Sequence, residues 1–182
     1  MNKIGINANH ITFLRIIGTI SLLFINIKAV VFYIVYAIAG FTDILDGYVA
    51  RKTNTVSDFG SKLDSVSDLL FYLVMILKFM PILIKILPFY IWIIAGAAVI
   101  IRLLAYFVAA LKFKKFSSMH TYLNKLTGFF VFLIPFAMLF KFKIYYFIFA
   151  AFLGLTASME ELIIHLILLE YKPNIKTLLA IK

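Results

Sequence analysis

The sequence contains no cysteine and only eight acidic residues among 182. The absence of cysteine excludes a disulfide framework and any metal site built from thiolates. The scarcity of acidic residues makes their positions informative, because five of the eight lie between Asp43 and Asp68.

Polar segments long enough for a separate soluble domain are also missing. Hydrophobic residues make up 64% of the chain and its mean hydropathy is +1.06, whereas soluble domains are about 45–50% apolar. We therefore predict an all-α integral membrane protein with a single domain over residues 1–182. Apolar stretches near the ~20 residues that a spanning helix needs predict a bundle of six transmembrane helices at 11–27, 29–50, 58–80, 88–111, 118–140 and 143–170.

The basic residues lie mostly between these stretches, so we attribute the net charge of +10 to membrane topology and expect no nucleic-acid partner. With both termini in the cytoplasm, eleven basic residues fall on the cytoplasmic side and five on the other, which is the bias of the positive-inside rule. We expect a cell-membrane protein whose termini and acidic cluster face the cytoplasm. The first stretch lacks a small-residue cleavage site before Asn26 and Lys28, which favours a retained helix over a signal peptide.

The acidic cluster has a regular spacing, Asp43-x-x-Asp46-Gly47-x-x-Ala50-Arg51, eight further residues, and then Gly60-x-x-x-Asp64-x-x-x-Asp68. Each pair of aspartates is three or four residues apart, so each pair lies on one face of its helix. A short polar turn at 52–57 predicts an antiparallel helix pair that brings the two faces together. Carboxylates at a membrane cost roughly 2.5–3.5 kcal/mol each, so we expect cations to compensate them.

Four carboxylates without cysteine or nearby histidine favour a hard divalent cation. We predict two ions, Mg²⁺ or Mn²⁺, and a pair of such ions would suit phosphoryl transfer. Gly47 and Gly60 would let a ligand approach the helix backbone closely, and the fork of Arg51 suits a diphosphate. Taken alone, the small residues would serve helix packing and Arg51 would be an interfacial anchor.

Two basic residues outside the cluster are candidates for binding a substrate phosphate. Arg102 lies in the middle of an apolar stretch, where an arginine is a functional hypothesis by default; the alternative is an ion pair with a structural carboxylate. Lys125 could bind phosphate or anchor its helix. Glu160, Glu161 and His165 form a second polar group, for which a metal site is conceivable, although Ser158-x-x-Glu161 also has the pattern of a capping box that begins a terminal segment.

The spacing from Asp43 to Asp68 resembles the signature of the CDP-alcohol phosphotransferase family, membrane enzymes that make phospholipid head groups, and meets every fixed position. The upstream Asn9-x-x-Thr12-x-x-Arg15 resembles an amino-terminal element that helps to hold the cytidine nucleotide, with Ala8 where a proline is common. The resemblance implies a homodimer and two metal ions bound by Asp43, Asp46, Asp64 and Asp68. It implies nucleotide binding by Asn9, Thr12, Asp46, Gly47, Ala50, Arg51 and Gly60, with Asp68 as general base.

The resemblance further implies transfer of a phosphatidyl group from CDP-diacylglycerol to a small hydroxyl acceptor, with release of CMP, among membrane lipids. Leu69-Leu70-Phe71 follows Asp68, which matches neither the lysine common in enzymes that use glycerol 3-phosphate nor the Ser-Phe-Gly common in those that use serine. Arg102 and Lys125 favour glycerol 3-phosphate, with inositol phosphate and serine as alternatives. The donor could also be a small CDP-alcohol passed to diacylglycerol. A divalent-cation transporter would explain the aspartates but not the spaced small residues, and a catalytically silent member would be expected to lack a motif carboxylate.

Overall fold

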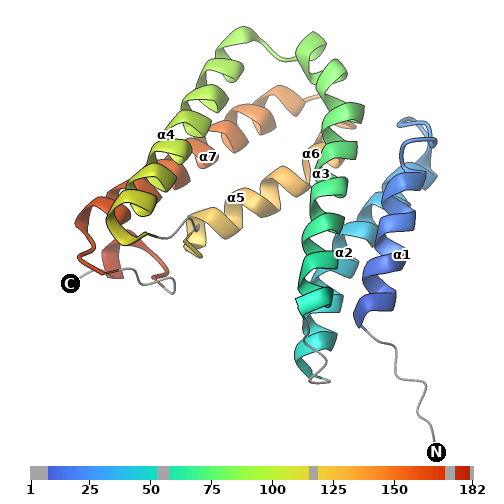
Figure 1. Ribbon diagram of the computed structural model, residues 1–182. Helices are drawn as coiled ribbons and strands as arrows, with labels where there is room; N and C mark the ends of the chain where they lie inside the picture. Colours follow the sequence, from blue (N-terminus) through green and yellow to red (C-terminus); the bar gives the residue numbers. More distant parts are fainter. Residues whose placement is uncertain (1–7, 53–57, 115–118, 171–174, 181–182) are drawn as a thin grey trace, which may run out of the picture. The chain divides into compact units, whose positions relative to one another are not determined.

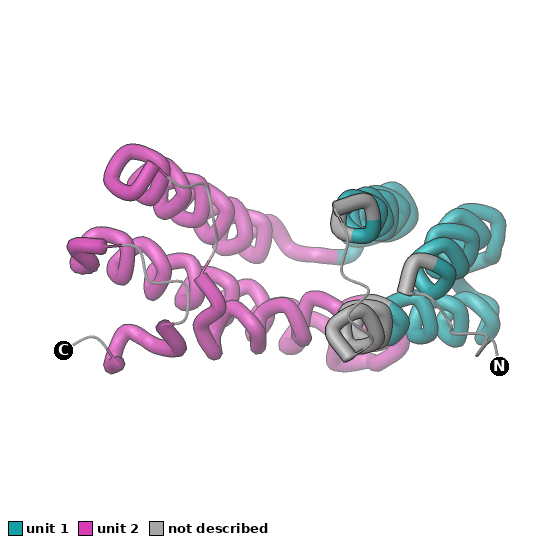
Figure 2. The backbone as a smooth tube through the Cα atoms, turned by 60° about the horizontal axis from the view of Figure 1, so that its bottom comes forward, with its two compact units in different colours: residues 1–86 teal, residues 87–182 magenta. Residues whose placement is uncertain are grey.

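The computed structural model describes residues 8–52, 58–114, 119–170 and 175–180, and the side chains of these residues apart from 8–9, 43–52, 58–59 and 61. Within these ranges every regular element is helical, which confirms the all-α prediction. The elements are α1 (Ala8–Ser21), α2 (Val30–Lys52), α3 (Asp58–Ile86), α4 (Phe89–Phe113), α5 (Tyr122–Phe132), α6 (Ile134–Ala137), α7 (Lys143–Ile167) and the 3-10 helix η1 (Leu178–Ala180) (Figure 1). They form two compact units, residues 1–86 and 87–182, which Figure 2 colours separately.

Three helical segments are long and apolar enough to cross a membrane, namely Lys62–Ile86, Phe89–Phe113 and Lys143–Ile167. They support the prediction of a membrane protein. The apolar part of α2 whose side chains are described, Val30–Thr42, is shorter. The count of six spans and the cytoplasmic orientation stay predictions.

Two of the predicted stretches differ from the helices observed. The first, 11–27, becomes α1, which has 14 residues and ends at Ser21; at 1.5 Å per residue it is shorter than the ~30 Å hydrocarbon layer. The fifth, 118–140, is divided into α5 and α6 at Leu133. Pro135 lies at the start of α6 and has no N–H with which to continue the hydrogen-bond ladder of α5. By contrast, α3 continues through Pro81 to Ile86.

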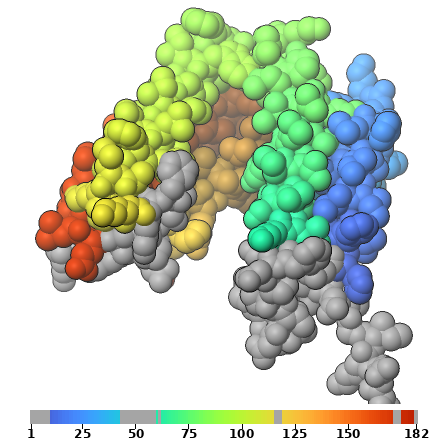
Figure 3. Space-filling view, in the orientation of Figure 1, coloured from blue at the N-terminus to red at the C-terminus, as the bar shows by residue number. Residues whose placement is uncertain are grey.

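The first unit is organised around one buried face of α1. Buried side chains recur every three or four residues, at Thr12, Arg15 and Thr19 of α1 and at Leu22 just after it, which is the spacing of a single helix face. This face packs against α2 and α3, and Figure 3 shows the side chains of α1 against those of α3. Three of these four residues are polar, and Arg15 among them hydrogen-bonds to Ser67 and Asp64 of α3, so this packing includes hydrogen bonds as well as apolar contact.

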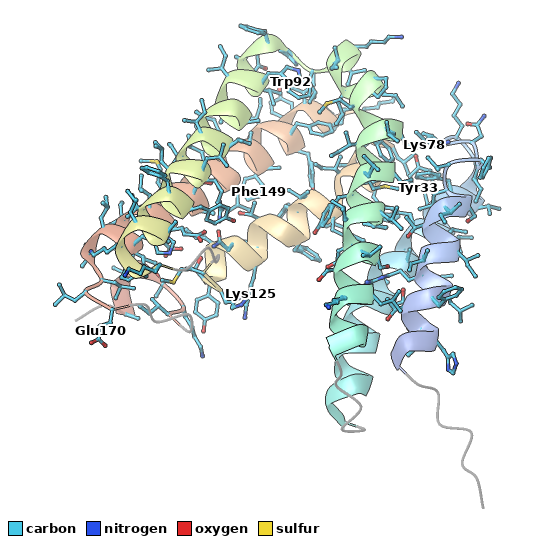
Figure 4. All side chains as sticks on the ribbon, in the orientation of Figure 1. Tyr33, Lys78, Trp92, Lys125, Phe149 and Glu170 are labelled. Carbon is cyan, nitrogen blue, oxygen red and sulfur yellow. The ribbon has the colours of Figure 1, made fainter. Side chains whose placement is uncertain are left out.

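Aromatic side chains join α2 to α3. The ring centroids of Phe32 and Phe79 are 5.7 Å apart, and those of Tyr36 and Phe71 are 5.3 Å apart. Lys78 of α3, labelled in Figure 4, donates from Nζ to the carbonyl oxygen of Ile25, which follows α1, at 3.0 Å. These contacts fix α3 against both of its neighbours.

The second unit is built on α4 and α7. The two helices run parallel, because contacts advance together along both chains, from Arg102 with Ser158 to Lys112 with the carbonyl oxygen of Leu166. The small residues Ala105, Ala109 and Ala157 are fully buried, which permits close approach of helices in a membrane protein. The helix α5 packs against α7 in the opposite direction, with the rings of Phe130 and Phe149 4.9 Å apart (Figure 4).

Candidate active site

The second aspartate pair of the motif lies on one face of α3. Asp64 and Asp68 are four residues apart, and their side chains are 46% and 47% exposed. Ser67, between them in sequence, is fully buried. The two carboxylates are therefore open to solvent on a helix whose adjoining surface is packed.

Arg15 of α1 contacts all three of these side chains. Its Nη2 lies 2.6 Å from Oδ1 of Asp64 and 3.3 Å from Oδ1 of Asp68. Its Nε donates to Oγ of Ser67 at 2.6 Å. Arg15 is 3% exposed, and a buried guanidinium needs anionic or hydrogen-bonding partners to offset its desolvation. The α1 face that carries Thr12 and Thr19 thus brings a cation to the motif carboxylates.

The first aspartate pair lies on the last turns of α2. Asp43 and Asp46 are helical, as predicted. Their side chains are outside those that the structure describes, as are those of Gly47, Ala50, Arg51 and Asn9. The expected meeting of four carboxylates therefore stays a prediction. Of the other nucleotide-binding candidates, Thr12 is buried in α1 and Gly60 lies one turn before Asp64 in α3.

The described part of this site fits a hard divalent cation. Its donors are carboxylate oxygens, which Mg²⁺ and Mn²⁺ prefer. The Oδ1 atoms of Asp64 and Asp68 converge on one cationic nitrogen, at 2.6 and 3.3 Å, so both carboxylates can face a single positive charge. Among the described side chains no third acidic residue or histidine joins them in a metal-binding group. A complete ligand set would need Asp43 and Asp46.

Arg102 of α4 is paired with a carboxylate of its own unit. Its Nη1 contacts Oε2 of Glu161, and its Nε donates to Oγ of Ser158 at 3.2 Å. This is an ion pair with a structural carboxylate, the alternative that the sequence leaves open for Arg102. Glu161, 59 residues away in sequence, supplies the anionic partner that Arg102 needs, so its burial no longer calls for a phosphate. A direct contact between Arg102 and a substrate phosphate stays a prediction.

Glu161 is the centre of a buried polar network. Besides Arg102, it accepts hydrogen bonds from the backbone N–H of Met119 and from Nδ2 of Asn124, each at 2.8 Å. Its side chain is fully buried. The capping-box interpretation of Ser158 and Glu161 is wrong, because both residues lie inside α7, where Ser158 donates to the carbonyl oxygen of Gly154.

Three candidates remain in the second unit: His165 and Glu160 make contacts within the fold, and Lys125 is exposed. His165 is fully buried, and its Nδ1 donates to the carbonyl oxygen of Ala105 at 2.9 Å. Glu160 accepts hydrogen bonds from Oγ1 of Thr177 and the N–H of Leu178. Lys125 is exposed on α5 (Figure 4), and its binding of phosphate stays a prediction.

Comparison with known proteins identifies the family of this chain. The sequence model of the CDP-alcohol phosphatidyltransferase family matches residues 6–165. The chain belongs to the CDP-alcohol phosphatidyltransferase family. The matched range includes the whole aspartate motif and Arg15, and the match confirms the resemblance found in the sequence.

Relatives in this family differ in the acceptor that their names give. The chain is 44% identical over 69 residues to CDP-diacylglycerol–serine O-phosphatidyltransferase of Methanocaldococcus jannaschii, covering 37% of this chain and 31% of that protein. It is 48% identical over 61 residues to CDP-diacylglycerol–inositol 3-phosphatidyltransferase of Candida albicans, covering 33% and 26%. It is 42% identical over 48 residues to CDP-diacylglycerol–glycerol-3-phosphate 3-phosphatidyltransferase of Rickettsia bellii, covering 25% and 26%.

The matched segments thus span about a quarter to a third of the length of these relatives. No solved structure matches the chain. The family is consequently established by the sequence match over residues 6–165, while the acceptor is left open among three chemically different molecules.

Sequence reasoning missed two contributors to the site. The family resemblance places Arg15 only in a nucleotide-binding element, and Ser67 is not a position of the motif. A signal for both exists in the sequence: Ser67 lies three residues after Asp64, on the same side of the helix, and Arg15 shares a face with Thr12 and Thr19. The pairing of these two faces needed the fold.

Proposed function

We propose that the protein transfers a phosphatidyl group from CDP-diacylglycerol to a hydroxyl of a small acceptor and releases CMP. The observation that carries the proposal is the half-exposed pair Asp64 and Asp68, held by Arg15 within a complete family motif. The match to a family of transferases also favours an enzyme over the cation transporter considered from the sequence.

In the proposed reaction, the acceptor hydroxyl oxygen attacks the lipid-bearing phosphorus of CDP-diacylglycerol. The bond from this phosphorus to the oxygen that bridges to CMP breaks, and CMP departs with that oxygen. The proton of the hydroxyl passes to Asp68, whose half-exposed carboxylate is accessible to a ligand. General-base transfer of this kind contributes typically ~10²–10⁴-fold to a rate.

We assign the binding of two divalent ions, Mg²⁺ or Mn²⁺, to Asp43, Asp46, Asp64 and Asp68. When bound, such ions would offset the charge of the diphosphate and of the departing CMP. Asn9, Thr12, Gly47, Ala50, Arg51 and Gly60 would bind the nucleotide half of the donor. The three apolar helices suit a donor with acyl chains in the membrane.

For the acceptor we propose glycerol 3-phosphate first, on the strength of the exposed Lys125 alone, since Arg102 is paired with Glu161. Serine, inositol and inositol phosphate complete the panel. The test is to incubate the purified protein with CDP-diacylglycerol, Mn²⁺ and each acceptor in turn, and to measure CMP and the lipid product. CMP release that depends on one acceptor identifies it; no lipid product with any acceptor contradicts the proposed transfer.

A further inference from the structure

Arg15 has the geometry of a fixed group and not of a mobile ligand. Its Nε donates to the fully buried Oγ of Ser67, and its Nη2 contacts both Oδ1 and the backbone carbonyl oxygen of Asp64, at 2.6 and 3.3 Å. The guanidinium is planar and its donors form a rigid fork. Bonds from two different nitrogens to one helix therefore set both the position and the plane of this group.

The distribution of exposure within this cluster is asymmetric. The Arg15 side chain is 2% exposed, whereas the carboxylates of Asp64 and Asp68 are 46% and 47% exposed. A surface ion pair would leave both partners in water, and a buried pair would enclose both. Here the cation lies beneath the carboxylates, on the protein side, and the carboxylates lie at the surface.

We propose that Arg15 is a positioning residue, which holds Asp64 and Asp68 in the shared orientation in which these two carboxylates bind a divalent cation. The inference rests on the proposed function, since the cation is that of the proposed site. It assigns Arg15 a role different from the nucleotide contact implied by the family resemblance.

The physical reason is the repulsion between two carboxylates one helical turn apart. Without a partner, each side chain would turn away from the other, and a metal ion would have to bring them together on binding. Contact of both Oδ1 atoms with one nitrogen removes this step before any ligand arrives. Partners behind the ligands of a metal typically change its affinity by about 10–100-fold when they are mutated.

The critical variant is Arg15→Lys, which keeps the positive charge but cannot reach Ser67 and both carboxylates with one rigid fork. Ser67→Ala removes the hydroxyl that accepts from Nε and keeps Arg15 itself. Lys62→Gln is the matched control, because Lys62 is exposed on the same helix two residues before Asp64 and its loss changes only the local charge. The probe is Mn²⁺ alone, titrated into each full-length protein in detergent with free Mn²⁺ measured by electron paramagnetic resonance.

We expect Arg15→Lys to weaken Mn²⁺ binding by about tenfold or more, Ser67→Ala by about threefold, and Lys62→Gln by less than about twofold. Binding by Arg15→Lys that is as tight as in the original protein, or tighter, overturns the inference, and so does an original protein that binds no Mn²⁺. If Arg15→Lys does not fold, as judged by its elution and thermal midpoint, the same criterion is applied to Ser67→Ala, whose unchanged affinity overturns the inference.

The CMP assay separates this inference from the proposed function. If the original protein makes phosphatidyl product while the Arg15→Lys variant binds Mn²⁺ normally, the proposed function stands and the assigned role of Arg15 is overturned. If the original protein makes no product with any acceptor while the variants show the graded loss of Mn²⁺ affinity, the role of Arg15 stands and the proposed function is overturned.

Discussion

An arginine pairs with carboxylates in each of the two units, but the pairs bury opposite partners. In the first unit Arg15 is 2% exposed, and its partners Asp64 and Asp68 are nearly half exposed. In the second unit Glu161 is fully buried and Arg102 is 21% exposed. A half-exposed carboxylate can bind a ligand from solvent in addition to its arginine, whereas a buried one that also accepts from Met119 and Asn124 is committed to the fold.

The comparison predicts that chemistry depends on the first pair and stability on the second. The largest expected effect is removal of divalent metal. If exposed carboxylates hold the catalytic ions, excess EDTA should abolish CMP release, and added Mn²⁺ should restore it. The thermal midpoint in excess EDTA should equal that of protein prepared without divalent metal. Full turnover in excess EDTA would contradict the metal assignment.

The next effect concerns Asp68→Asn, which keeps the shape of the side chain and removes its basicity. We expect turnover to fall by a factor on the order of 10²–10⁴ while CDP-diacylglycerol binding persists. Turnover and equilibrium binding of the donor should be measured on the same preparation. Parallel loss of both would show that Asp68 is a metal ligand or structural residue first and that the base lies elsewhere.

The third prediction addresses the buried pair. Glu161→Ala removes the acceptor of three contacts and leaves Arg102 without its anion, so we expect a loss of about 3–5 kcal/mol in the free energy of unfolding. The double variant Arg102→Ala/Glu161→Ala should lose less than the sum of the single variants, with a coupling of about 0.5–3 kcal/mol. Denaturant unfolding in mixed micelles provides the measurement.

Kinetics of Arg102→Ala supply the control for this cycle. Because Arg102 is engaged by Glu161 and Ser158, KM for the acceptor and for CDP-diacylglycerol should both stay within about twofold of the original values. A strong rise in KM for the acceptor alone would indicate a direct contact between Arg102 and that substrate. It would contradict the assignment of chemistry to the first ion pair and of stability to the second.

The smallest predicted effect lies at the edge of the second unit. Thr177→Val removes one of the two described hydrogen bonds to Oε1 of Glu160 and leaves the one from the N–H of Leu178. A loss of about 0.5–1.5 kcal/mol in the free energy of unfolding is expected, with turnover unaffected. A loss comparable to that of Glu161→Ala would mean that the second unit depends as much on its edge as on its centre.

The sequence predicted features that depend on local pattern. The helices that carry the aspartate motif follow from apolar length and from a polar turn, and the family follows from fixed spacing between Asp43 and Asp68. The break before Pro135 could have been predicted too, because a proline cannot donate within a helix. The length of α3 beyond Pro81 could not, since tolerance of a proline depends on the surrounding packing.

The partners of the two arginines were beyond local pattern. Arg15 meets Ser67, 52 residues away, and Arg102 meets Glu161, 59 residues away. Both sets of contacts depend on which helix face packs against which. Hydrophobic periodicity does not determine that packing in helices that are apolar on nearly every side. For the same reason, the position of Arg102 in an apolar stretch does not reveal that its carboxylate partner, Glu161, lies in α7.

The docking of the final segment bears on where this chain can be shortened or tagged. The family match ends at residue 165, but the carbonyl oxygen of Lys176 accepts from the N–H of Tyr122 at the start of α5. Ile175 and Leu178 also pack against the buried cluster of Met119, Ile164 and Leu168. A protein cut at the family boundary would lose Leu168, Ile175 and Leu178 and leave Met119 and Ile164 uncovered, so an affinity tag for purification belongs at the amino terminus.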